Sequence, residues 1–95
     1  MLVAEMTALL DEIAAVISDD GADRAQVERK LTDGYAHALA LESERLRLEK
    51  RIAELAERRG SKATQEVAML NRELDGTSGN LATLRSTLAE LRKRR

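Results

Sequence analysis

The chain has 95 residues, enough for one small domain, and its apolar fraction of 43% is mostly leucine and alanine, without phenylalanine or tryptophan. This composition excludes a core of large aromatic rings, and the absence of cysteine excludes disulfides and thiolate catalysis. The net charge of −1 argues against a strongly basic nucleic-acid-binding chain, whereas 35% charged residues is typical of long helices and coiled coils.

Residues 2–18 are predicted to form an amphipathic helix. Glu5 and Glu12 fall on one face, and apolar side chains recur at helical spacing on the other. The apolar face is either part of the core, which is the interpretation we favour, or a docking face for a partner helix. Its large residues are Leu2, Met6, Leu9, Ile13, Val16 and Ile17. The run Asp19-Asp20-Gly21 predicts the end of this helix.

A second helix is predicted over residues 22–58, where Asp23 and Gln26 have the spacing of a capping box. Its apolar residues step three and four apart and form a heptad seam, interrupted by Gly34 and Arg45. The large residues of this seam are Leu31, Leu41, Leu48, Ile52 and Leu55. Leu39 and Leu46 lie seven residues apart on a different stripe, which predicts a second apolar face available to a partner.

A turn is predicted at residues 59–61, because Gly60 suits a left-handed helix end and Ser61 suits a helix cap. The third helix is predicted over residues 62–94, with apolar positions alternating four and three apart. Its large seam residues are Val67, Leu70, Leu74, Leu81, Leu84, Leu88 and Leu91. The heptad phase is the same before and after the glycine-containing segment 75–80, so we expect one helix with a weak point there.

The short turn predicts that the second and third helices are antiparallel neighbours. The predicted fold is therefore all-α: one domain over residues 1–95, with an antiparallel coiled-coil hairpin and a short N-terminal amphipathic helix. The apolar surface exceeds what a free monomer of this size can bury. We therefore expect a homodimer or a higher oligomer, forming a larger helical bundle, or association with another helical protein.

No pattern in the sequence predicts an enzyme. It has no glycine-rich phosphate loop and no cluster of metal ligands, and His37 is expected on a helix flank or at the surface. The glutamates and arginines of residues 42–54 are spaced for ion pairs on a solvated helix face. We therefore expect no cofactor and no bound metal. The predicted function is that of a non-enzymatic coiled-coil scaffold or adaptor, acting by self-association and by binding helices.

An alternative function is accessory binding to nucleic acid. Two basic clusters could contact phosphates, one at the hairpin turn and one at the C-terminus: Arg58, Arg59 and Lys62, and Arg92, Lys93, Arg94 and Arg95. Cations at these places also complement helix dipoles, which accounts for them without a ligand. The acidic polar face of the first helix argues against membrane binding. The absence of a secretory signal predicts a cytoplasmic protein, and the arginine-rich composition suggests a bacterial source.

Overall fold

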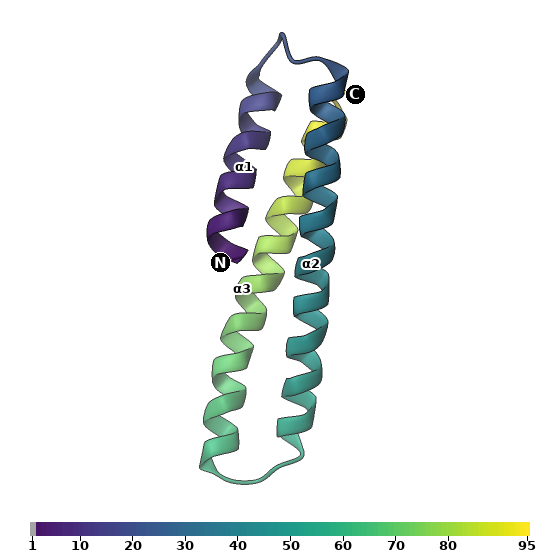
Figure 1. The fold of residues 1–95 in the computed structure, drawn as a ribbon. Helices are drawn as coiled ribbons and strands as arrows, with labels where there is room; N and C mark the ends of the chain where they lie inside the picture. The colour runs from purple at the N-terminus through teal and green to yellow at the C-terminus, as the bar shows by residue number, and fades with distance from the viewer. Residues whose placement is uncertain (1) are drawn as a thin grey trace.

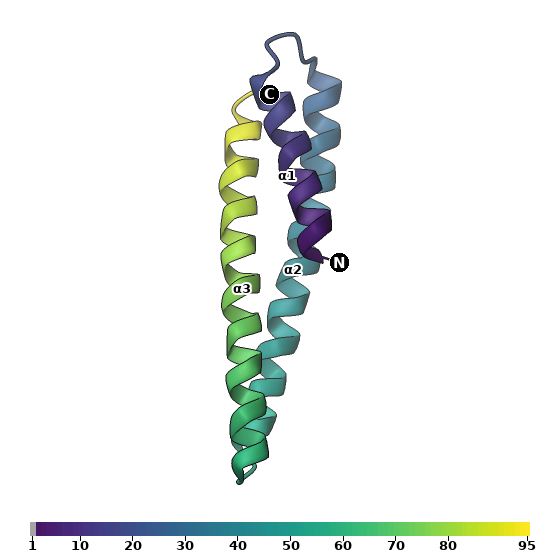
Figure 2. The same ribbon diagram turned by 90° about the vertical axis from the view of Figure 1, so that its left-hand side faces the viewer.

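The computed structural model describes the backbone of residues 2–95 and the side chains of residues 5–95, and it forms an all-α helical hairpin with a third helix. The helices are α1 (Leu2–Ser18), α2 (Arg24–Ala56) and α3 (Ser61–Arg92). The antiparallel helices α2 and α3 lie side by side along a rod of 58 × 18 × 16 Å, and α1 accompanies them over only part of that length (Figures 1 and 2). The predicted all-α class and the predicted helical hairpin are thereby confirmed.

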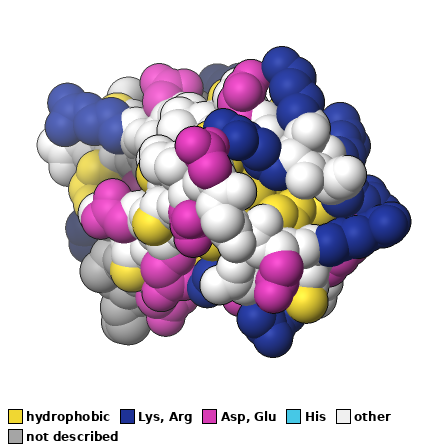
Figure 3. All heavy atoms as spheres, turned by 90° about the horizontal axis from the view of Figure 1, so that it is seen from above, with side chains coloured by type: hydrophobic (Ala, Val, Ile, Leu, Met, Phe, Trp, Pro, Cys, Tyr) yellow, Lys and Arg dark blue, Asp and Glu magenta, His cyan; other side chains and the backbone are white. Residues whose placement is uncertain are grey.

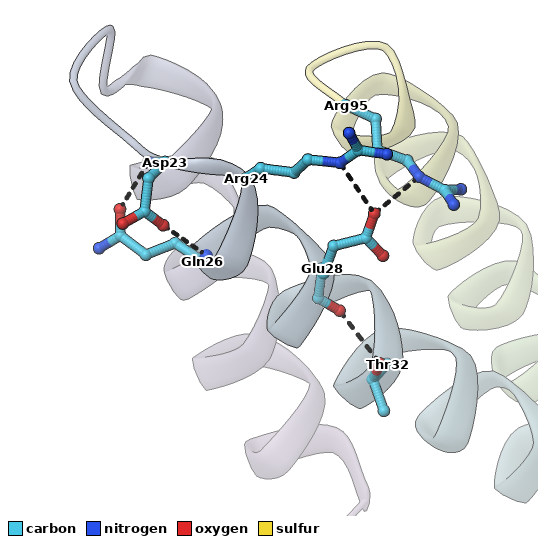
Figure 4. A network of polar contacts seen from close by, with 6 residues as sticks. All are labelled: Asp23, Arg24, Gln26, Glu28, Thr32 and Arg95. Atoms are coloured by element: carbon cyan, nitrogen blue, oxygen red, sulfur yellow. Dashed lines mark hydrogen bonds and ion pairs between the residues drawn. The ribbon is translucent and has the colours of Figure 1, made fainter.

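The start of α2 is fixed by the capping box that the sequence predicted. The Asp23 side chain accepts a hydrogen bond from the Gln26 backbone N–H at 2.8 Å, and the Asp23 N–H donates to Gln26 Oε1 at 3.0 Å (Figure 4). Two backbone groups at the helix start are therefore satisfied within the chain. The same region is tied to the C-terminus, because Glu28 accepts a hydrogen bond from Arg95 Nε at 2.9 Å.

The turn between α2 and α3 depends on Gly60. This residue is the N-cap of α3 and has φ 127° and ψ 161°, a backbone conformation that is essentially restricted to glycine. The expectation that Ser61 caps α3 is wrong, because Ser61 is already the first helical residue and the cap has no side-chain hydrogen bond. Instead, Thr64 Oγ1 donates to the Gly60 carbonyl at 3.1 Å.

The glycine-containing segment 75–80 lies inside α3, which continues through it without a break. A Cβ atom added to Gly76 or Gly79 would meet nothing within 4 Å, so no contact within the chain requires glycine at either position. Gly34 of α2 differs, because an added Cβ would overlap the side chain of Leu88. Gly34 therefore allows α2 and α3 to approach closely where Leu88 packs.

The hydrophobic core occupies the half of the rod that contains α1, the start of α2 and the end of α3. Here Met6, Leu9 and Ile13 of α1 pack against α2 and α3, with the Ile13 side chain fully buried. The remaining core side chains are Val27, Leu31, Ala38, Leu41, Leu81, Leu84, Leu88 and Leu91. The hairpin continues beyond this core toward its turn as a pair of helices. The molecule thus has a three-helix half and a two-helix half (Figure 1).

Candidate helix-binding face

The hairpin has two long flanks, and α1 covers part of only one of them. Lys30 of α2 donates a hydrogen bond to Glu12 of α1 at 2.7 Å, which places α1 on the Lys30 flank. Arg51 and Glu66 pair across the hairpin on this same flank, nearer the turn, at 3.6 Å. Tyr35, five residues after Lys30, points to the opposite flank because an α-helix turns by about 100° per residue.

The opposite flank carries an apolar groove between α2 and α3. Its volume is about 410 Å³, and it is lined by Tyr35, Ala38, Leu39, Glu42, Arg85, Leu88, Ala89 and Arg92. Heptad spacing continues this flank toward the turn through Leu46 and Glu49 of α2 and through Asp75 and Ala82 of α3. We call this surface the open face, defined by Tyr35, Leu39, Glu42, Leu46, Glu49, Asp75, Ala82, Arg85, Ala89 and Arg92.

Three large apolar side chains are exposed on the open face. Leu39 and Leu46 are each 64% exposed, and Tyr35 is 42% exposed. They follow one another along α2 at spacings of four and seven residues, so they form a single stripe. An isolated exposed leucine is ordinary in a soluble protein, but a stripe bordering an apolar groove is typical of an interaction site.

The charges of the open face are unevenly distributed along its length. Arg85 and Arg92 lie in the three-helix half, whereas Glu49 and Asp75 lie nearer the turn. Arg85 forms an ion pair with Glu42 across the hairpin, and Glu49 lies 3.6 Å from Arg45 of its own helix. Asp75 and Arg92 have no ion pair with any residue from 5 to 95.

The residues of the predicted seam all lie between α2 and α3, but they differ in burial. Eight of them are buried: Leu31, Leu41, Leu48, Leu55, Leu81, Leu84, Leu88 and Leu91. The other four are half-buried and lie in the two-helix half: Ile52, Val67, Leu70 and Leu74. The predicted seam is therefore continuous in space, and in the two-helix half its half-buried residues alternate with the buried Leu48 and Leu55 of α2.

The predicted partner-face residues separate into two groups. In α1, Met6, Leu9 and Ile13 are buried in the core, and Val16 and Ile17 pack against its edge. These residues are therefore covered by the chain's own α2 and α3, while Leu2 falls outside the described side chains. Leu39 and Leu46 form the second group, and they are exposed on the open face.

The two basic clusters considered for phosphate binding lie at opposite ends of a rod 58 Å long. Arg58, Arg59 and Lys62 are at the turn, and Arg92, Lys93, Arg94 and Arg95 are at the other end. At that end, Arg95 pairs with Glu28 at 2.9 Å, Lys93 with Glu90 at 3.0 Å, and Arg94 lies 4.0 Å from Asp20. Seen from this end, acidic side chains lie among the basic ones (Figure 3). The two clusters do not combine into one basic surface.

Other kinds of site have little support in the part of the chain that the structure describes. No group of three or more His, Asp or Glu side chains there is arranged to hold a metal ion. His37 lies on a helix flank, as expected, and its Nε2 is buried without a hydrogen-bond partner. None of the described helices has the length and apolar character needed to cross a membrane.

Sequence reasoning identified the leucines of the open face but missed the side chains that complete it. The sequence places Glu42 on a solvated helix face and Arg92 in the basic C-terminus, and it does not single out Arg85 or Ala89. Their positions in the heptad were the available signal, because residues flanking the same side of an antiparallel seam face one another. Comparisons of the chain with protein-family models, curated proteins and solved structures gave no match.

Proposed function

We propose that the protein is a non-enzymatic coiled-coil scaffold or adaptor that associates with itself or with another helical protein through the open face. The observation that carries this proposal is the exposed stripe of Tyr35, Leu39 and Leu46 beside an apolar groove. A helix laid into such a groove buries apolar side chains at every third or fourth position.

The composition of the groove supports a helix as its ligand. Ala38 and Ala89 are small enough for a neighbouring backbone to come close, while Leu39 and Leu88 supply apolar surface. Glu42, Arg85 and Arg92 border the groove and can fix the orientation of the bound helix through charge. This arrangement has the apolar centre and polar rim of a protein interface.

The test is the solution mass across a concentration series, measured by sedimentation for the wild-type chain and for the double variant Leu39→Glu, Leu46→Glu. We expect the wild-type mass to rise above 10.5 kDa with concentration, or to rise on addition of a helical partner. We expect the double variant to remain at the monomer mass with unchanged helical circular dichroism, because charged groups are costly to bury.

The matched control is Met69→Glu. Met69 is 60% exposed, almost as much as the two leucines, but it does not belong to the open face. We expect this variant to associate like the wild type. Equal association of all three proteins would contradict the proposal, because the open face would then contribute nothing to binding.

A further inference from the structure

Building on the proposed function, we propose that the occupant of the open face is a second copy of this chain, docked antiparallel about a two-fold axis. In this dimer α2 lies against the partner's α2, and α3 lies against the partner's α3. The two hairpins stack face to face as two layers of two helices each, and each α1 remains on the outside. The contacts that place the axis come from both helices of the open face.

On α2, the axis is placed by the two most exposed leucines of the open face. In an antiparallel pair of identical helices, residues equally spaced on either side of the axis face each other. An axis passing between Glu42 and Ser43 brings Leu39 against the partner's Leu46, and Leu46 against the partner's Leu39. Both side chains, 64% exposed in one chain, are then covered by an equivalent leucine.

On α3, the axis is placed independently by charge. An axis at Asn80 brings Arg85 against the partner's Asp75, and Asp75 against the partner's Arg85. Asp75 has no ion pair with any described residue of its own chain, so this contact supplies its only counter-charge. Two opposite-charge pairs result from one two-fold operation.

The two placements agree, which is the main argument for the antiparallel dimer. Gly34 lies against Leu88, and this contact fixes the relative levels of the two antiparallel helices. Residues that lie the same number of positions from this contact, counted toward the turn, are at the same level of the rod. The interval between Glu42 and Ser43 of α2 is therefore level with the interval between Gly79 and Asn80 of α3. The leucine pairs and the charge pairs therefore share a single axis to within about one residue rise of 1.5 Å.

The residues of α3 nearest this axis are small on the side facing the partner. Ser78 and Ala82 follow one another there at a spacing of four residues. These small side chains allow the partner's α3 to approach closely.

A parallel dimer fits the same face less well. A two-fold axis along the rod would place α2 over the partner's α3, so Leu39 and Leu46 would not meet each other. It would also place Glu49 and Asp75 beside the same acids of the partner, which is unfavourable. In the antiparallel dimer the two Glu42 carboxylates come near each other at the axis, but each is paired with Arg85 of its own chain. Asp75, which would meet the same acid across a parallel dimer, has no such partner among the described residues, so the charge distribution favours the antiparallel arrangement.

The experiment uses the absence of native cysteine and two full-length variants, Leu39→Cys and Leu46→Cys. A disulfide requires Cβ atoms about 3.5–4.5 Å apart, so it reports direct opposition. We expect an equimolar mixture to give a disulfide-linked heterodimer on mild oxidation, at least tenfold more than either variant alone. The control mixture of Leu39→Cys with Met69→Cys, which is off the open face, is expected to give only background cross-linking.

A charge exchange provides the second measurement. Arg85→Asp and Asp75→Arg should each weaken dimerisation, by about tenfold in Kd, because each places like charges together. The double variant should recover most of the wild-type affinity, since it restores both opposite-charge pairs with the two charges exchanged. A structural role within one chain would not produce this recovery, because Arg85 and Asp75 do not contact each other within it.

The outcomes separate this inference from the proposed function. Self-cross-linking of Leu39→Cys alone at the level of the mixture would overturn the antiparallel dimer. A second contradicting result would be an assembly that is lost in the double variant Leu39→Glu, Leu46→Glu but gives no mixed disulfide. In that case the open face would still be the binding surface, but the antiparallel dimer would be wrong. A wild-type mass of 10.5 kDa at every concentration would also overturn the second copy as the occupant.

Discussion

The three-helix and two-helix halves of the rod are built from the same heptad pattern but differ in how well they bury it. In the three-helix half, Leu81, Leu84 and Leu91 are at most 1% exposed, because α1 closes the third side of the core. In the two-helix half, Val67, Leu70 and Leu74 have identical spacing and remain half-buried. Heptad spacing therefore determines which side chains face a neighbour. The third helix completes the burial of the seam on α3, whereas on α2 Leu48 and Leu55 are only 6% and 2% exposed without it.

The length of α1 explains where the boundary falls. Its 17 residues span about 26 Å, whereas the 33 residues of α2 span about 50 Å. One short helix folded back from the start of α2 can therefore cover only about half of the hairpin. The contrast between the halves can be tested by substitutions matched in chemistry, in descending order of expected effect.

The largest expected difference is between Leu84→Ala and Leu70→Ala, two identical truncations on α3. Leu84 is fully buried in the three-helix half, so its loss should lower the free energy of unfolding by about 3–5 kcal/mol. Leu70 is half-buried in the two-helix half and should lose about 1–2 kcal/mol, since less surface leaves water there. Urea unfolding at one protein concentration measures both. Equal losses would show that the halves are equally well packed.

Glycine substitutions should differ in sign between Gly34 and Gly76. Gly34→Ala introduces a methyl group that overlaps Leu88 in the core, and it should destabilise the fold by about 1–3 kcal/mol. Gly76→Ala fills open space in a helix and should stabilise it by about 1 kcal/mol. Thermal unfolding followed by circular dichroism distinguishes the two. A stabilised Gly34→Ala variant would contradict the close approach of α2 and α3.

The two helix starts should also respond differently. Asp23→Ala removes the capping box of α2 and should lower the free energy of unfolding by about 1 kcal/mol. Ser61→Ala is the matched control at α3, where no side chain caps the helix, and should change stability by less than about 0.5 kcal/mol. Chemical unfolding of both variants gives the comparison. A larger loss in Ser61→Ala would mean that this serine does cap α3.

The smallest effect is expected at the ion pair that ties α1 to α2. The hydrogen bond to Glu12 raises the pKa of Lys30 above its usual 10.5, so the charged pair stabilises the fold below that pH. This contribution should be lost as the pH rises through the folded-state pKa. Because the pair is partly exposed, Lys30→Met should cost only about 0.2–1 kcal/mol at neutral pH and should flatten the stability curve above pH 10.5.

Much of the fold follows directly from the sequence, because the spacing of the leucines predicts the hairpin. The helix bounds differ from the predicted ones by two residues or fewer, mainly because helix ends depend on caps such as Gly60. The heptad phase is the same on both sides of residues 75–80, which predicts the unbroken α3 that the structure shows. These features depend on the spacing of residues along the chain, which can be read from a single sequence.

The candidate site was only partly predictable. Leu39 and Leu46 stand out because they form a stripe away from the seam, but the sequence does not say which flank α1 covers. That choice places the Lys30 flank under α1 and leaves Tyr35, Arg85 and Arg92 exposed around a groove. It depends on packing between segments far apart in the chain, such as Glu12 with Lys30, which periodicity does not encode.

The pairing of two open faces is tested most directly by small-angle X-ray scattering of the wild-type chain across a concentration series. The antiparallel dimer overlaps two rods almost completely, so the mass should double while the longest dimension stays close to the 58 Å of one chain. A doubled mass with a longest dimension approaching twice that length would mean end-to-end association. That result would contradict the open face as the surface that joins the two copies.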